Sequence, residues 1–251
     1  MQTVDFKNSP LENVFMLVYG ASGTGKTHLM GSLGELGYVA IIDSDRGWRT
    51  LQTAKDLTPF VDNIEVISFD KFKDLDSLYK LTAENDPAEW AKAAGVDKPF
   101  KKPFDWVVID TWSEVQWYML QELRKRSGLG GGDKERLDFR QNIQIQHWGA
   151  MTDLNKLAIE AFKSCKGINI VFVMQEGSNK DELTGQIIKG PAIHGKLMQE
   201  VPAYFEVVVH TYSNVMGDWC ATTLPKGGWP AKTRLGKGKD LKFPTAKELL
   251  L

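Results

Sequence analysis

An eight-residue segment at positions 20–27, Gly-Ala-Ser-Gly-Thr-Gly-Lys-Thr, constrains this chain more than any other feature. It directly follows an apolar run over 14–19 and precedes a stretch of helical character over 28–36. Glycines let the backbone coil tightly, so that successive N–H groups and the positive end of the following helix converge on one anion. The segment therefore has the pattern of a P-loop between a strand and a helix, which predicts binding of a nucleoside triphosphate.

The last positions of the loop carry side chains with separate roles. We expect the Lys26 ammonium to reach the β- and γ-phosphates and the Thr27 hydroxyl to ligate Mg2+. ATP and Mg2+ are therefore the predicted cofactors. The predicted nucleotide-binding residues are Gly20, Ala21, Ser22, Gly23, Thr24, Gly25, Lys26, Thr27 and His28.

The length of 251 residues, with 42% hydrophobic and 25% charged residues, suits one large domain. We expect an ATPase core over about 14–235, followed by a basic C-terminal tail over about 236–251. The net charge of −1 excludes a global field that would draw the protein onto DNA or a membrane. Any binding to a polyanion must therefore come from local patches of charge.

Cysteine content and targeting patterns point to one compartment. Cys165 and Cys220 provide no disulfide framework and fit a reducing environment as packed thiols. The chain shows no basic region followed by an apolar stretch at its start, and no run long enough to span a bilayer. We therefore expect a soluble cytoplasmic protein that does not contact membranes.

Strand-like and helix-like segments alternate along the chain. Apolar runs bounded by polar residues predict buried strands at 38–43, 64–69, 106–110, 168–174, 206–212 and 219–224. Apolar residues at helical spacing predict helices at 112–126, about 144–163 and about 194–200, with a helical insertion over about 84–103 and a long polar loop up to residue 190. This alternation predicts an α/β fold with a mainly parallel central sheet and helices on both faces. Ligands then bind at the carboxyl ends of the strands.

Asp110 ends the apolar run over 106–109, which makes it the expected acidic partner of the P-loop. In P-loop NTPases such a carboxylate holds Mg2+ together with the hydroxyl at the position of Thr27. The alternative is that Asp110 caps the next helix. Many P-loop ATPases place a glutamate directly after this aspartate to polarise the attacking water, but this chain has Thr111 there. The water-activating carboxylate must therefore come from elsewhere.

The segment Ile41-Ile42-Asp43-Ser44-Asp45 resembles the RecA-like branch of P-loop ATPases, in which that carboxylate follows the strand after the P-loop helix. The resemblance implies that Asp45 activates water, with Asp43 and Glu114 as alternatives. The other interpretation of the segment is that Asp43 and Asp45 form a turn and cap a helix at Trp48.

The segment Val171-Phe172-Val173-Met174-Gln175 resembles the RecA-like strand whose terminal glutamine senses the γ-phosphate. The resemblance implies that Gln175 passes this state to a following DNA-binding loop, which would correspond to the polar stretch over 176–189. The charges of Glu176, Asp181 and Glu182 in that stretch weigh mildly against DNA contact.

Pro230-Ala231-Lys232-Thr233-Arg234 resembles the Lys-x-Arg pair that reaches into the nucleotide of a neighbouring subunit in ring- or filament-forming RecA-like proteins. The resemblance implies self-association and a catalytic role for Lys232 and Arg234, because a positive group supplied across an interface offsets charge in phosphoryl transfer. The alternative is an exposed basic strand end.

Two later motifs are similar to those of phage-encoded, core-only RecA-like ATPases of single-strand annealing and recombination. They are a Gly-Pro-x-Ile-x-Gly-Lys stretch (Gly190, Pro191, Ile193, Gly195, Lys196) and a Val-Pro-x-Tyr-Phe stretch over 201–205. The resemblance covers about 14–237. It implies single-stranded DNA as a partner, a single-strand-binding protein as a further one, and the cytoplasm of the host cell as the location.

Two basic clusters are candidate nucleic-acid contacts. The first lies near the C-terminus, where Asp240 is outnumbered by Lys226, Lys232, Arg234, Lys237, Lys239, Lys242 and Lys247. The second flanks a triple glycine, with Phe139 and Trp148 as platforms for stacking bases, and comprises Arg124, Lys125, Arg126, Lys134, Arg136 and Arg140. The alternative is a solvated helix end and an ordinary basic tail.

Other functions are compatible with the same loop. A nucleotide-gated loader or binding module would use ATP as a conformational switch and hydrolyse it poorly, which the short side chain of Asp45 favours. A small-molecule kinase also uses a P-loop, but such kinases usually place an Arg-rich lid over the acceptor, and the sequence shows no stretch with that pattern.

Overall fold

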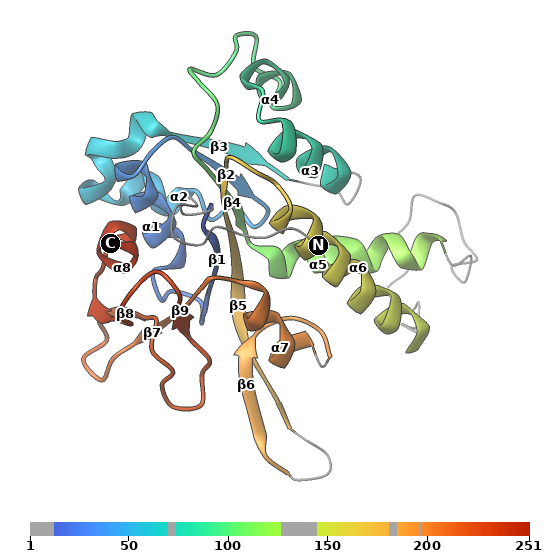
Figure 1. Ribbon diagram of the computed structural model, residues 1–251, viewed down its shortest axis with the longest axis vertical. Coiled ribbons are helices and arrows are strands. Elements are labelled where there is room, and N and C mark those ends of the chain that lie inside the picture. The colour runs from blue at the N-terminus through green and yellow to red at the C-terminus, as the bar shows by residue number, and fades with distance from the viewer. Residues whose placement is uncertain (1–12, 70–73, 127–144, 181–184, 196) are drawn as a thin grey trace, which may run out of the picture.

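A central sheet brings distant parts of the chain together in the computed structural model, which describes residues 13–69, 74–126, 145–180, 185–195 and 197–251 (Figure 1). The strands are β1 (Phe15–Gly20), β2 (Val39–Asp43), β3 (Ile64–Ser68), β4 (Trp106–Asp110), β5 (Asn169–Lys180), β6 (Ile187–Pro191), β7 (Val207–Ser213), β8 (Trp219–Thr222), β9 (Lys232–Thr233) and β10 (Asp240–Lys242). The α-helices are α1 (Lys26–Gly31), α2 (Arg49–Thr53), α3 (Asp74–Glu84), α4 (Pro87–Ala93), α5 (Trp112–Arg126), α6 (Ile145–Lys163), α7 (Leu197–Glu200) and α8 (Ala246–Leu250). Shorter 3-10 helices are η1 (Ser32–Glu35), η2 (Lys55–Asn63) and η3 (Val201–Tyr204).

The strand order is β10-β8-β7-β1-β5-β4-β2-β3, with β6 paired to β5 and β9 paired to β7. Strands β7, β1, β5, β4, β2 and β3 run parallel, whereas at one edge β8 pairs antiparallel with β7 and β10 pairs antiparallel with β8. The prediction of a mainly parallel sheet is therefore confirmed. The order places β5, which carries Gln175, and β4, which ends at Asp110, on one side of β1, and β7 and β8 on the other.

Helices cover both faces of the sheet, as predicted (Figure 1). Side chains alternate along β1, so that Leu17 and Tyr19 face one core while Met16 and Val18 face the other. The first core packs against α3, α4, α5, α6 and α7, and the second packs against α1, η1 and α8. Because both faces are buried, the parallel strands are almost continuously apolar.

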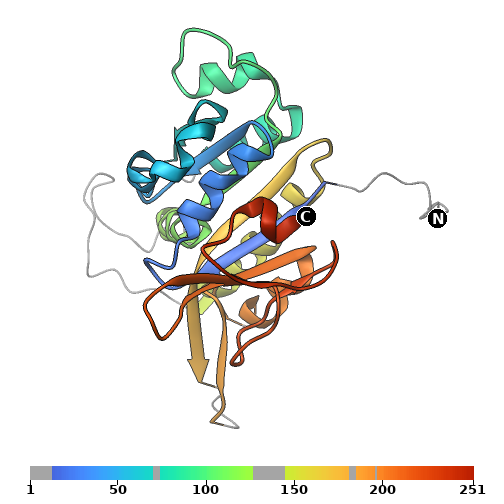
Figure 2. The same cartoon turned by 90° about the vertical axis from the view of Figure 1, so that its left-hand side faces the viewer.

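In the polar stretch over 176–189, the described residues 176–180 and 187–189 are not a loop as predicted but lie in two paired strands of a β-hairpin. Strand β5 continues past the buried sheet to Lys180 and pairs antiparallel with β6, from Glu176 opposite Pro191 to Lys180 opposite Ile187. The two strands satisfy each other's backbone groups, so the segment remains extended although its side chains are polar. The hairpin projects from the rest of the molecule in both views (Figures 1 and 2).

The end of the chain is part of the fold, so the prediction of a basic tail is wrong. Strand β10 pairs with β8, and α8 begins with a capping box formed by Thr245 and Glu248. Leu249 and Leu250 are 4% and 9% exposed in the second core. The Ala246 amide also donates to the Ser32 hydroxyl at 2.7 Å, which fastens α8 to η1.

Candidate nucleotide-binding site

The P-loop begins where β1 ends, between two parallel neighbours. Gly20 lies opposite Gln175 of β5 and opposite Thr211 of β7. A Cβ atom added to Gly20 would lie 2.2 Å from both the carbonyl oxygen and the hydroxyl oxygen of Thr211, so a side chain does not fit there. The start of the loop is therefore packed directly against a neighbouring strand.

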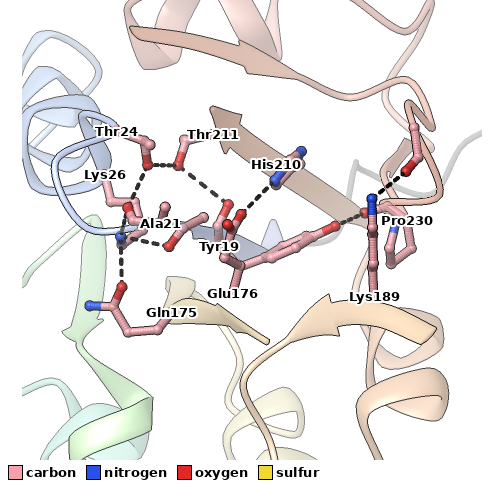
Figure 3. A network of polar contacts seen from close by, with 12 residues as sticks. Tyr19, Ala21, Thr24, Lys26, Gln175, Glu176, Lys189, His210, Thr211 and Pro230 are labelled. Carbon is pink, nitrogen blue, oxygen red and sulfur yellow. Dashed lines mark hydrogen bonds and ion pairs between the residues drawn. The ribbon is translucent and has the colours of Figure 1, made fainter. Parts of the chain in front are cut away.

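Glycines shape the loop and threonines hold it. Gly23 and Gly25 have φ angles of 77° and 83°, in the left-handed region that favours glycine. The Thr24 hydroxyl donates to the Ala21 carbonyl at 2.7 Å and lies 2.7 Å from the Thr211 hydroxyl (Figure 3). The conformation of the loop is thus determined both by its own glycines and by contact with β7.

Lys26 places a cation in the middle of the loop. It is 7% exposed, and its Nζ donates to the carbonyl oxygens of Gly20 at 2.8 Å and Ala21 at 2.7 Å (Figure 3). Nζ also donates to Oε1 of Gln175 at 3.2 Å. Burial lowers the pKa of the ammonium, and the charge of Asp110 opposes that shift. Phosphate oxygens are stronger acceptors than these neutral groups, so the site suits a phosphate chain.

Thr27 and Asp110 are brought together as the predicted metal pair. The Thr27 hydroxyl donates to Oδ2 of Asp110 at 2.8 Å. Asp110 is 1% exposed, and burial raises its pKa to about 7. A nearby divalent cation would stabilise this buried carboxylate, and Mg2+ needs few protein oxygens because waters and phosphates complete its shell. In the described part of the chain, no group of three or more histidine, cysteine or acidic side chains could hold a metal ion.

The turn after β2 brings two more carboxylates close to this pair. The Gly47 amide donates to Oδ1 of Asp43 at 2.8 Å and to Oδ1 of Asp45 at 3.0 Å. A Cβ atom on Gly47 would lie 3.3 Å from the Thr27 hydroxyl oxygen and 3.8 Å from Oδ2 of Asp110. Asp43 is buried, which raises its pKa, whereas Asp45 is exposed. Asp45 therefore lies on a turn beside the predicted metal site.

The alternative interpretation of this segment holds in part. Asp43 and Asp45 close a turn, but α2 begins at Arg49 with Trp48 as its N-cap and without a side-chain cap hydrogen bond. Glu114, the other candidate for activating water, lies in the first turn of α5. The water-activating role of Asp45 stays a prediction.

Gln175 connects the loop to the β5–β6 hairpin. Its side chain accepts from Lys26, while its amide donates to the Ser113 hydroxyl at 3.0 Å. Its carbonyl oxygen accepts from the Ala192 amide at 2.6 Å. The residue that contacts the buried lysine is therefore also fixed to the first turn of α5 and to the segment that follows the hairpin.

A buried histidine that contacts a glutamate lies beside the loop, and the sequence did not predict this pair. His210 is 3% exposed, its Nε2 lies 3.1 Å from Oε2 of Glu176, and its ring stacks between Tyr19 and Trp229 with centroid distances of 4.9 and 4.8 Å. Burial lowers the pKa of His210, and the hydrogen bond to Glu176 opposes that shift. No local pattern identifies this group, because its members meet only through the pairing of β1 with β5 and β7.

The side chain of His28 is engaged outside the loop. Its Nε2 lies 2.8 Å from Oδ2 of Asp56, and its ring contacts Trp219 edge-on at 5.3 Å between centroids. A role of His28 in phosphate binding would therefore use its main chain.

Lys232 and Arg234 lie away from the loop of their own chain. Lys232 pairs with Val208 near the start of β7, and the Arg234 amide donates to the Glu206 carbonyl at 3.1 Å. The loop adjoins Thr211, at the other end of β7. The structure does not bring this basic pair to the site within one subunit.

Acidic residues offset much of the first basic cluster. Lys226 pairs with Asp240 at 2.8 Å, Lys242 with Asp218 at 2.6 Å, and Lys247 with Glu35 at 2.7 Å. Asp218 and Glu35 lie outside the segment whose charges were counted, so the local count overstated the positive excess. The structure therefore weakens the case for a DNA surface at the end of the chain.

Of the second cluster, Trp148 lies within the described residues, and its ring stacks on His194 at 4.1 Å. Several other predicted positions lie outside them. These are Lys134, Arg136, Phe139, Arg140, Asp181, Glu182 and Lys196, together with the side chains of Arg124, Lys125 and Arg126.

The fold and the loop together define a P-loop NTPase class of protein: a parallel α/β sheet with Lys26, Thr27 and Asp110 at the strand ends. The chain belongs to the AAA domain family, whose model matches residues 12–235. It is also similar to a solved structure of the RadB recombinase, with a TM-score of 0.47 and 14% sequence identity, over 94% of this chain and 89% of that one. A comparison with curated proteins gave no match. Within the described residues, no helix is both long and apolar enough to cross a membrane.

Proposed function

We propose that this protein is a Mg2+-dependent, RecA-like ATPase that binds single-stranded DNA, self-assembles, and serves annealing or recombination in a phage-type replication system. The observation that carries the proposal is the contact between Lys26 Nζ and Gln175 Oε1 at 3.2 Å. It joins the phosphate-binding loop to the strand that becomes the projecting hairpin. Membership of the AAA domain family supports the nucleotide-binding part.

In this proposal, each residue of the site has a defined task. The loop amides and Lys26 hold the phosphates, and Thr27 and Asp110 hold the metal. Bound Mg2+ would offset the charge of the β- and γ-phosphates. Asp45 orients and deprotonates the attacking water as a general base.

Gln175 is the proposed sensor of the terminal phosphate. A phosphate that draws Lys26 away from Gln175 would release one of the three groups that hold this residue. The remaining bonds, to Ser113 and Ala192, connect it to α5 and to the end of the hairpin. Binding of a nucleotide to the loop would thereby change how the hairpin contacts DNA.

Self-assembly completes the proposal. Lys232 and Arg234 lie at the opposite end of β7 from the loop, so a head-to-tail contact would be needed to bring them to a nucleotide. Hydrolysis would then depend on protein concentration, because the positive groups come from a neighbour.

The test is an ATPase assay with and without single-stranded DNA, across salt and protein concentrations. We expect DNA to stimulate hydrolysis, and the stimulation to fade as salt rises because phosphate contacts are screened. A rate insensitive both to DNA and to protein concentration would contradict the proposal.

A second candidate is a nucleotide-gated loader or binding module with weak hydrolysis. It is favoured by the hydrogen bond from Gly47 to Asp45, which engages the short carboxylate in a turn. Loss of nucleotide binding in Lys26→Ala, with unchanged partner binding in Asp45→Ala, would support this candidate. A marked fall in hydrolysis in Asp45→Ala would support the ATPase instead.

A further inference from the structure

The strand order indicates where the base of a bound nucleotide lies. Gln175, which lies opposite Gly20 on β5, and Asp110, which ends β4, are on one side of β1, so the reacting end of the triphosphate belongs there. The rest of the nucleotide must leave the loop away from these groups. That direction leads toward β7 and β8, on the other side of β1.

Trp219, the first residue of β8, lies against the loop on that side. A Cβ atom added to Gly25 would lie 2.5 Å from Cδ2 and 3.0 Å from Cε2 of the indole, so the backbone of the loop touches the ring. Phe243 meets the same indole edge-on, with 5.8 Å between centroids, and His28 does so at 5.3 Å. Aromatic rings therefore gather directly beside the phosphate-binding loop.

This cluster is partly open to solvent. Phe243 is 50% exposed, and Trp219 is only partly buried. The rings of His28 and Phe243 are inclined to the indole by 60° and 69°, so neither stacks on it in parallel. Flat aromatic ligands prefer offset-stacked contact with such rings.

The cluster is also held in place before any ligand arrives. Asp56 fixes the His28 ring through a contact of 2.8 Å. Asp218, next to Trp219, binds Lys242 at 2.6 Å, and Lys242 lies 5.0 Å above the Phe243 ring. Since little side-chain freedom would be lost on binding, a stacked base would add to affinity.

We propose that Trp219 and Phe243 form the platform on which the base of the bound nucleotide stacks. This inference rests on the proposed nucleotide binding and assigns residues to a part of the ligand that the P-loop does not contact. Stacking uses the face of the ring, which every base has, so the platform supplies affinity and little discrimination between purines.

The test compares the affinity for Mg·ATP with that for inorganic tripolyphosphate, measured by calorimetry on the full chain. We expect Trp219→Ala to weaken ATP binding about tenfold or more, the range for loss of one stacked base. Its affinity for tripolyphosphate should match that of the wild type, because no base is present. Trp219→Phe should restore most of the loss.

Two further variants guard against a folding artefact. Phe243→Ala removes a half-exposed ring and should weaken binding of ATP, and not of tripolyphosphate, by a few-fold. Trp117→Ala removes a tryptophan that is 48% exposed on α5 and should change neither affinity. Equal losses for both ligands in Trp219→Ala, or no loss in either platform variant, would overturn the inference. A wild-type protein that binds tripolyphosphate and ATP equally well would overturn the inference of a base platform but leave the P-loop function intact. A wild-type protein that binds neither ligand would contradict the proposed function itself.

Discussion

The Thr27 hydroxyl donates a hydrogen bond to Asp110 at 2.8 Å, although 83 positions separate the two residues in the chain. The contact arises because β4 ends at the same edge of the sheet as β1, with β5 between them. It joins the last residue of the P-loop to a buried carboxylate. Among the described residues, no charged group lies within hydrogen-bond distance of this carboxylate. The pair is the structural basis for metal binding in this account.

Removing the charge of Asp110 should abolish productive metal use. Asp110→Asn keeps the shape of the side chain but not its charge, so we expect ATP hydrolysis to fall about a hundredfold, as when one electrostatic contact to a transition state is lost. Thr27→Val should have a similar effect, whereas Thr27→Ser retains the hydroxyl and should be active. Phosphate release measured against Mg2+ concentration checks this, and wild-type Mg2+ dependence in Asp110→Asn would contradict it.

Lys232 and Arg234 should act on the nucleotide of a neighbouring subunit. A protein carrying both Lys232→Ala and Arg234→Ala retains its P-loop, and Lys26→Ala retains its basic pair, so each alone should hydrolyse ATP poorly. Mixing the two should restore part of the activity, because some interfaces then combine an intact loop with an intact basic pair. The measurement is the ATPase rate against mixing ratio. No recovery at any ratio, with both variants folded, would exclude action across an interface.

The C-terminal helix should contribute to global stability. Leu249→Ala removes a side chain that is 4% exposed in the second core, and we expect it to lower the free energy of unfolding by about 2–5 kcal/mol. Lys247→Ala, two residues earlier in the same helix, breaks only an exposed ion pair with Glu35 and should cost less than about 1 kcal/mol. Urea unfolding followed by circular dichroism compares them. Equal stability of Leu249→Ala and wild type would mean that α8 is not part of the cooperative unit.

Local sequence patterns are sufficient to predict the P-loop, Asp110 and the start of the C-terminal helix. The P-loop is contiguous in sequence, and Asp110 directly ends an apolar run, so neither required knowledge of the sheet order. Thr245 and Glu248 also form a readable Thr-x-x-Glu capping pattern before the apolar residues of α8. That pattern predicts a helix over about 246–250, where a basic tail was expected.

Other features depend on which strands become neighbours. Glu176 meets His210, and Trp219 meets Gly25, only because β7 lies beside β1 and β8 beside β7. The part of β5 that extends past the sheet, residues 176–180, is polar, so the apolar alternation that identifies strands is weak there. The charge partners of Lys226 and Lys242 likewise come from other strands and turns.

Acidification should destabilise the protein through His210. The folded ring binds its proton less readily than free histidine, whose pKa is about 6.5, so below that pH the unfolded chain takes up more protons and folding is disfavoured. The charged groups that face the ring are Glu176, Lys189 and Lys226. His210→Phe keeps a ring between Tyr19 and Trp229 but cannot titrate.

The check is the melting temperature of both proteins between about pH 8 and pH 5. We expect that of the wild type to fall more steeply than that of His210→Phe as pH decreases. Both proteins contain the same buried carboxylates, so the difference between their melting temperatures at each pH reports the contribution of His210. Parallel curves would show that His210 does not couple protonation to folding.

Binding of Mg·ATP to the folded wild type and to Lys26→Ala, measured by calorimetry, tests the central claim most directly. The account predicts saturable binding to the wild type that depends on Mg2+, and a loss of about tenfold or more in Lys26→Ala, because a charged hydrogen bond to phosphate is removed. A folded wild-type protein that shows no affinity for Mg·ATP would contradict the account.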